Sequence, residues 1–260
     1  MVAAVGLRRE TTVEPQALSP NRGEVLARYR HLREISKRHL SDAMKFLSRD
    51  AILHHARRLG LTFGKTLILD NMDEITLAFD LAIHTAPDGR SRAIDRYARS
   101  AQFASGSDEA LMLEAMRASR FAVILVRRRH PSVGLIVSDL FRNIELWLVD
   151  EGLEISLPVG AAFATRYYAP DDFVLTAGVG MPIDLDLLVS AVESAPQLLR
   201  KSRVEVIEDR RFAEAVYRAA IVDGLMEGVA YRDVPGTGDA VWRLASRDRC
   251  DLYRSGAPGR

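Results

Sequence analysis

Short apolar runs in the middle of the chain constrain its fold more than any other feature of the sequence. They are separated by turn residues and cover residues 121–126, 133–137, 144–149, 162–168 and 173–179. Apolar runs of this length, about ten residues apart, are typical of β-strands joined by short turns. We therefore predict an antiparallel β meander or small barrel over residues 120–182. Within it, the acidic sequence Asp150-Glu151-Gly152 is interpreted as a turn between two strands.

Helical periodicity precedes and follows this region. From residue 24 to about residue 47, apolar side chains recur every three to five positions, as on one face of a helix. Ser48 is predicted to cap a second helix, which we expect to end at Gly60 in a left-handed conformation. A short strand over 66–69 follows, and further helices are predicted over residues 73–84, 91–101, 108–119, 184–199 and 208–231. The sequence therefore predicts an α+β fold: an N-terminal helical subdomain, a central antiparallel β unit and C-terminal helices.

The predicted elements divide the chain into consecutive units. Residues 1–23 combine prolines, polar residues and charges without periodicity, so we expect a flexible N-terminal arm. A helical subdomain over 24–119, the β unit over 120–182 and helices over 183–232 follow, and residues 233–260 form a turn-rich tail. The 260 residues are 48% hydrophobic and 27% charged, as expected for a globular protein with a buried core.

The single cysteine and the lack of a long apolar stretch bear on the compartment. Cys250 alone excludes an internal disulfide framework and any zinc site built from several cysteines, and it fits a reducing environment. No apolar run approaches the roughly 20 residues needed to span a bilayer, and the N-terminal residues lack the order of a secretory signal. We therefore expect a cytoplasmic protein with no membrane partner.

The sequence GLTFGKTLILD, residues 60–70, contains the Gly-Lys-Thr of a nucleotide-binding P-loop. That motif places four residues before Gly-Lys-Ser/Thr, whereas only three separate Gly60 from Gly64. A P-loop also follows a strand and opens a helix, because the helix N-terminus presents free N–H groups to phosphate. This segment follows a predicted helix and precedes an apolar run. We interpret it as a helix-to-strand turn and expect no cofactor.

The helix predicted after Ser48 is amphipathic. Ile52, Ala56 and Leu59 fall on one face, and His54, Arg57 and Arg58 fall on the opposite face. Such a cationic face can contact phosphate groups of nucleic acid, or it can simply be a solvated face beside an acidic neighbour. The residues that we predict to contact nucleic acid under the first interpretation are Arg49, His54, Arg57, Arg58 and Lys65.

Asp73, Asp80 and His84 share one face of a predicted helix, because they are spaced by seven and four residues. A carboxylate and a histidine one turn apart are suitable metal ligands, so Asp80 and His84 are candidates for a metal-dependent hydrolase. Since apolar residues form the opposite face, we expect these side chains to point outward or toward a neighbouring helix. An Asp80–His84 side-chain pair is the preferred interpretation, and no metal is expected.

Charge is distributed unevenly along the chain. Residues 22–66 carry 11 Lys and Arg against 4 Asp and Glu, a net +7, whereas residues 139–193 carry 2 Arg against 10 Asp and Glu, a net −8. Such segments can present a nucleic-acid surface, pack against each other, or meet across a homodimer.

No sequence signature of nucleophilic catalysis is present, since the chain lacks a Gly-x-Ser-x-Gly elbow and no histidine follows Cys250. We therefore expect a non-enzymatic regulatory or protein-interaction protein, with a protein partner or self-association through the basic N-terminal helices and the acidic β region. The alternative is a nucleic-acid-binding protein that uses the basic helix around residues 49–65. A metal-dependent hydrolase is a further alternative.

Overall fold

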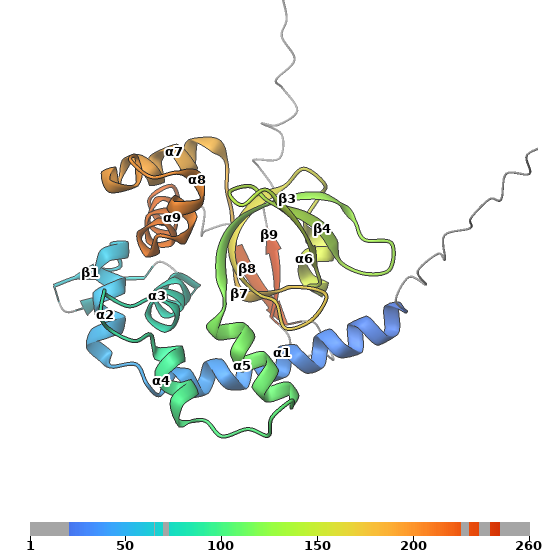
Figure 1. Cartoon of the computed structure of the whole chain (residues 1–260). Coiled ribbons are helices and arrows are strands. Elements are labelled where there is room, and N and C mark those ends of the chain that lie inside the picture. The colour runs from blue at the N-terminus through green and yellow to red at the C-terminus, as the bar shows by residue number, and fades with distance from the viewer. Residues whose placement is uncertain (1–20, 65, 70–72, 225–228, 234–239, 245–260) are drawn as a thin grey trace, which may run out of the picture.

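The computed structural model describes residues 21–64, 66–69, 73–224, 229–233 and 240–244, and has an α+β fold (Figure 1). Most of the predicted arm over 1–23 and tail over 233–260, together with Lys65 and Cys250, lies outside these residues. Helices lie at both ends of the described chain, and an antiparallel sheet lies between them, as predicted. Within the described residues, no helix is both long and apolar enough to cross a membrane.

The N-terminal half contains helices and one small hairpin. Its elements are α1 (Arg22–Met44), α2 (Arg49–Leu59), β1 (Thr62–Phe63), β2 (Thr66–Leu67), α3 (Asp73–His84), α4 (Ala93–Ser100) and α5 (Asp108–Arg117). The predicted caps of α2 are confirmed. The Ser48 side chain accepts a hydrogen bond from the Ala51 N–H at 3.1 Å, and Gly60 has a φ of 85°. Thr66 of the Gly-Lys-Thr motif lies in β2, opposite Phe63 of β1, and not at a helix N-terminus.

The central sheet has five strands in the order β5-β4-β3-β6-β7. They are β3 (Arg120–Arg129), β4 (Leu135–Asp139), β5 (Ile144–Leu148), β6 (Ala162–Tyr168) and β7 (Leu175–Pro182), and each contains most of one predicted apolar run. Strands β3 to β5 form a meander, and β6 pairs with the other side of β3. The edges of the sheet meet at one parallel bridge, Leu148 to Val174, so the sheet curves strongly without closing into a barrel.

The remaining elements correct three details of the prediction. Asp150 does not form a simple turn: its side chain accepts hydrogen bonds from the Gly152 and Leu153 N–H groups and begins the short helix α6 (Glu151–Ser156). The helix that begins after Asp184 is shorter than predicted, because α7 (Leu185–Glu193) gives way to the 3-10 helix η1 (Pro196–Leu198). The last predicted helix, over 208–231, is observed as α9 (Arg210–Val222). The short helix α8 (Arg203–Glu208) precedes it, and residues 229–231 belong to a strand. That strand is β8 (Val229–Asp233), which pairs with β9 (Ala240–Leu244) in an antiparallel hairpin.

Both faces of the central strand β3 are buried. Phe121 and Val123 pack against the helices, in a cluster that includes Phe212 of α9. The alternating Ala122, Ile124 and Val126 pack inside the curved sheet. Figure 1 shows α2, α3, α7, α8 and α9 gathered on one side of the sheet, with α1 passing along its lower edge. The sheet therefore supports a layer of helices that packs on one of its sides.

Candidate functional site

Helix α2 has the amphipathic arrangement that its sequence predicts. Ala56 and Leu59 are buried, whereas His54, Arg57 and Arg58 are exposed. The helix ends at Gly60, and the Leu61 N–H donates to the Ala56 carbonyl oxygen at 2.8 Å. Because Leu61 is itself buried, the hairpin that follows is fixed close to the last turn of α2.

One of these cations is neutralised by helix α9. Arg58 Nε donates to both carboxylate oxygens of Glu214 at 2.7 Å, and this hydrogen bond raises the pKa of Arg58. The Nδ1 atom of His55 is buried and lies 4.0 Å from the same carboxylate. Burial, followed by the proximity of His54, lowers the pKa of His55 to about 4, so its ring is neutral at pH 7. An acidic neighbour is therefore present, but it contacts only one side of α2.

Other cations of this region are exposed to solvent. Arg49 and Arg57 are exposed and have no ion pair among the described residues. Arg218 is exposed on α9, one turn beyond Glu214 and on the same side of that helix. Lys65, the remaining predicted contact, lies outside the described residues. The surface over α2 and α9 is therefore cationic even after Arg58 is neutralised.

Large apolar side chains lie beside these cations on the β1–β2 hairpin. Phe63 is 78% exposed and Ile68 is 55% exposed, and Leu67 is also exposed. The hairpin is held by the pairing of Phe63 with Thr66 and by a 3.0 Å hydrogen bond from the Ile68 N–H to the Leu61 carbonyl oxygen. We call the combined region the α2 surface. It consists of Arg49, His54, Arg57, Arg58, Phe63, Leu67, Ile68 and Arg218.

Three arginines of the other basic helix, α1, pair with the acidic segment of the same chain. Arg22 pairs with Glu154 at 2.9 Å, Arg28 with Asp171 at 3.0 Å, and Arg30 with Glu151. These contacts show which of the predicted arrangements applies to α1: the basic and acidic segments pack against each other.

Asp80 and His84 are both buried and do not face solvent. Asp80 accepts hydrogen bonds from Arg166 Nε at 2.9 Å, Arg166 Nη2 at 3.1 Å and the Tyr217 hydroxyl at 2.9 Å. Burial alone would raise the pKa of Asp80, but the charge of Arg166 outweighs it and holds this pKa below the ordinary value. Of the two predicted orientations, outward or toward a neighbouring helix, the second applies to Asp80, since its carboxylate meets Tyr217 of α9. In place of the predicted Asp80–His84 side-chain pair, Asp80 pairs with Arg166.

His84 is bonded elsewhere. Its Nδ1 lies 3.2 Å from the Ser119 hydroxyl, and its Nε2 lies 3.3 Å from the Tyr168 hydroxyl. Burial, and then the charge of Arg166, lowers the pKa of His84 to about 3. Both oxygens of Asp80 face a guanidinium group, an arrangement that opposes cation binding. In the part of the chain that the structure describes, no group of three or more His, Cys, Asp or Glu side chains could hold a metal ion.

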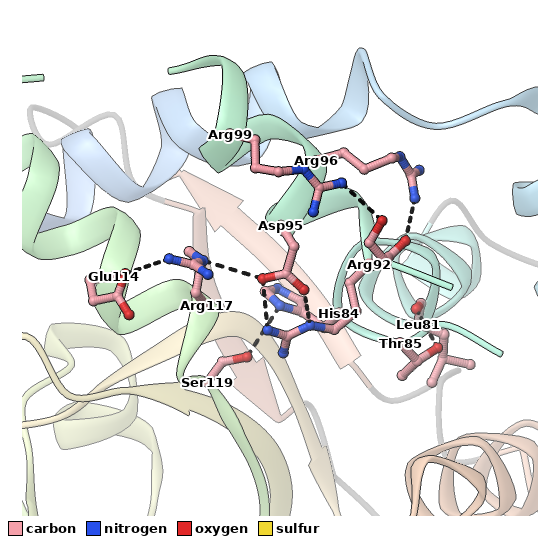
Figure 2. A network of polar contacts seen from close by, with 11 residues as sticks. Leu81, His84, Thr85, Arg92, Asp95, Arg96, Arg99, Glu114, Arg117 and Ser119 are labelled. Carbon is pink, nitrogen blue, oxygen red and sulfur yellow. Dashed lines mark hydrogen bonds and ion pairs between the residues drawn. The ribbon is translucent and has the colours of Figure 1, made fainter. Parts of the chain in front are cut away.

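Figure 2 shows the Ser119–His84 contact beside a cluster of polar contacts around Asp95. Asp95 of α4 accepts hydrogen bonds from Arg92 at 2.7 Å and from Arg117 at 3.2 Å. Arg96 donates to the Phe46 carbonyl oxygen at 2.7 Å and so ties α4 to the connection between α1 and α2. Sequence reasoning missed this network because the contacts that join its elements, Arg117 to Asp95, Ser119 to His84 and Arg96 to Phe46, lie 22 to 50 positions apart in the chain. Its groups are engaged with one another, so we interpret it as structural.

The strongly lowered pKa values of His55 and His84 predict a loss of stability in acid. His55 and His84 stay neutral in the folded chain, whereas both bind protons in the unfolded chain below its ordinary pKa of 6.5. The free energy of unfolding should therefore fall as pH drops from about 6.5 to 4, by up to about 1.4 kcal/mol per pH unit for each histidine. Urea unfolding at several pH values measures this slope. His55→Gln should reduce it, and an unchanged slope in both His55→Gln and His84→Gln would contradict the assignment.

Comparison with known proteins identifies a family whose function is unknown. Residues 24–227 match the model of a protein family described as Family of unknown function (DUF7986). No curated protein and no solved structure matches the chain. The matched range contains the α2 surface, the sheet and helices α7 to α9.

Proposed function

We propose that this chain, which belongs to the family of unknown function DUF7986, is a non-enzymatic protein-interaction protein that binds an acidic protein partner through the α2 surface. One observation carries the proposal: exposed cations and large exposed apolar side chains lie together within residues 49–68. We also place the protein in the cytoplasm, because its single cysteine fits a reducing compartment.

The apolar part of the α2 surface favours a protein partner. Exposed apolar side chains grouped on a surface commonly mark interaction sites, whereas single ones need no explanation. Aromatic residues and arginine are the types that contribute most binding energy when they are buried at protein interfaces. Phe63 and Ile68 would bury little apolar surface beside phosphate groups, but they can pack against an apolar stripe of a protein partner. The partner that fits is an amphipathic helix with acidic residues beside its apolar face.

Binding of nucleic acid is the second candidate, favoured by the same cations and by Phe63, whose ring can stack on an unpaired base. The two functions differ in their salt dependence and in the part of the surface that they require. Phosphate contacts weaken steeply with salt, because each releases counterions. An interface with a buried apolar centre retains more of its affinity.

The proposal is tested by fluorescence anisotropy with labelled probes. We expect the purified chain to bind an acidic amphipathic helical peptide, unrelated to its own sequence, more tightly than single- or double-stranded DNA or RNA at physiological salt. Arg57→Glu should weaken peptide binding by about tenfold or more, because it places like charges opposite each other. Phe63→Ala should weaken it as well. Arg127→Glu is the matched control, since Arg127 is exposed on β3 in the sheet.

Two results would contradict the proposal. The first is tighter binding of nucleic acid that falls steeply with salt and is unaffected by Phe63→Ala, which would favour a phosphate-binding function. The second is peptide binding that Arg57→Glu and Arg127→Glu weaken equally, which would show a general charge effect instead of a defined surface.

A further inference from the structure

Helix α7 has the chemistry that the α2 surface would recognise. Leu185 is 73% exposed and Val189 is 46% exposed, and they lie one turn apart on the same face. Asp186 and Glu193 are exposed on the same helix, which contains no lysine or arginine. An apolar stripe beside acidic side chains is therefore present on the surface of this chain.

Helix α9 lies between the two regions. It packs against α7 and against α2, and Figure 1 shows α7 above it and α2 below it. The outer side of α9 carries Arg218 and, one turn further, Val222, which is 76% exposed. Helices α7, α9 and α2 thus lie in succession, with acidic and apolar side chains exposed on α7 and cationic and apolar side chains exposed on the α2 surface.

We propose that the acidic partner is a second copy of this chain, whose α7 packs on the α2 surface. This inference rests on the proposed function and names its partner. A rotation of 180° about an axis that lies in the interface, beside the exposed side of α9, would bring each α7 onto the α2 surface of the other copy. Both contacts would form at once, giving a closed dimer and not an open filament. Charge complementarity supports this occupant, since the acidic side chains of α7 face a surface with exposed arginines.

The dimer contains the contact between α7 and the α2 surface twice. The proposal can therefore be tested by reversing the charges on one side of this contact at a time. The variant of the α2 surface is Arg57→Glu with Arg218→Glu, and the α7 variant is Asp186→Arg with Glu193→Arg. All four side chains are exposed, and Arg58 and the capping Asp184 stay unchanged because they support the fold. Each variant alone places like charges across both contacts. An equimolar mixture of the two restores opposite charges at both.

Sedimentation velocity of the full chain over a range of concentrations measures the result. We expect the wild-type chain to dimerise, each variant to weaken dimerisation by about tenfold or more, and the mixture to recover it. Arg127→Glu should dimerise like the wild type. Equal thermal unfolding midpoints for monomeric forms of all variants would exclude misfolding as the cause.

The outcomes separate this inference from the proposed function. A wild-type chain that stays monomeric at every concentration, or variants that dimerise as well as the wild type, would overturn the second-copy inference. If that monomer still binds the unrelated acidic peptide through Arg57, the proposed function stands with another partner. If it binds no acidic peptide either, both fail.

Discussion

Replacing Arg166 by leucine is expected to lower the free energy of unfolding by about 3–5 kcal/mol, the typical effect of removing one partner of a buried ion pair. Both side chains of the Arg166–Asp80 pair are buried, and Asp80 also accepts a hydrogen bond from Tyr217. In Arg166→Leu the carboxylate would stay in the interior without its cation. It would then have to bind a proton or draw water into the core, and either response destabilises the folded chain. Equilibrium urea unfolding at pH 7 measures the change.

The double variant Asp80→Leu with Arg166→Leu provides the control. It removes both charges and should recover much of the lost stability, because apolar replacement of a whole buried pair is often close to neutral. Tyr217→Phe should have a smaller effect, about 1–3 kcal/mol, since it removes one hydrogen bond to a buried charge. If Arg166→Leu alone changed stability by less than about 1 kcal/mol, the pair would not be the buried contact described.

Gly134→Ala is expected to lower the free energy of unfolding by about 2–5 kcal/mol, through backbone strain and overpacking together. Gly134 has a φ of 81°, a conformation that disfavours any side chain with a Cβ. An added Cβ would also lie 2.3 Å from the Leu148 carbonyl oxygen, closer than two such atoms can approach. Since that oxygen belongs to the backbone of β5, relief would require the β4–β5 pairing to shift.

Gly160→Ala separates the two contributions. Gly160 has a φ of 88°, but an added Cβ would meet no atom within 4 Å. Its replacement should therefore cost only the strain of the left-handed conformation, about 1–2 kcal/mol. Thermal or urea unfolding of both variants measures the difference. Equal losses at the two positions would show that the close approach to Leu148 does not limit the fold.

Local features of the fold could be predicted from the sequence. The strands of the central sheet could be predicted because each contains an apolar run between turn residues. The ends of α2 could be predicted because the Ser48 side chain caps its first turn and Gly60 adopts the left-handed conformation at its last turn. Helix α6 was missed because Asp150-Glu151-Gly152 has the composition of a turn, and the helix is too short to show periodicity. The left-handed Gly224 lies just beyond the end of α9, which the prediction extended too far.

The candidate site could be predicted only in part. Periodicity identified the exposed cations of α2, because one face of a helix is visible in about two turns of sequence. It could not show that Arg58 meets Glu214, which is 156 residues away, or that Asp80 meets Arg166, 86 residues away. The apolar hairpin gave no signal, since an exposed strand of apolar residues has the same sequence pattern as a buried one.

The contacts of α1 have a consequence for how the chain is made. Arg22 and Arg30 of α1 pair with Glu154 and Glu151, which follow them by 132 and 121 residues in the sequence. At about 5–20 residues per second, the ribosome takes roughly 6–26 s to synthesise that interval. Arg28 meets Asp108 of α5 much earlier, at 2.6 Å, before Asp171 is made. Helix α1 is therefore expected to dock on α5 first, and a nascent chain stalled before residue 151 would present Arg22 and Arg30 without Glu154 and Glu151.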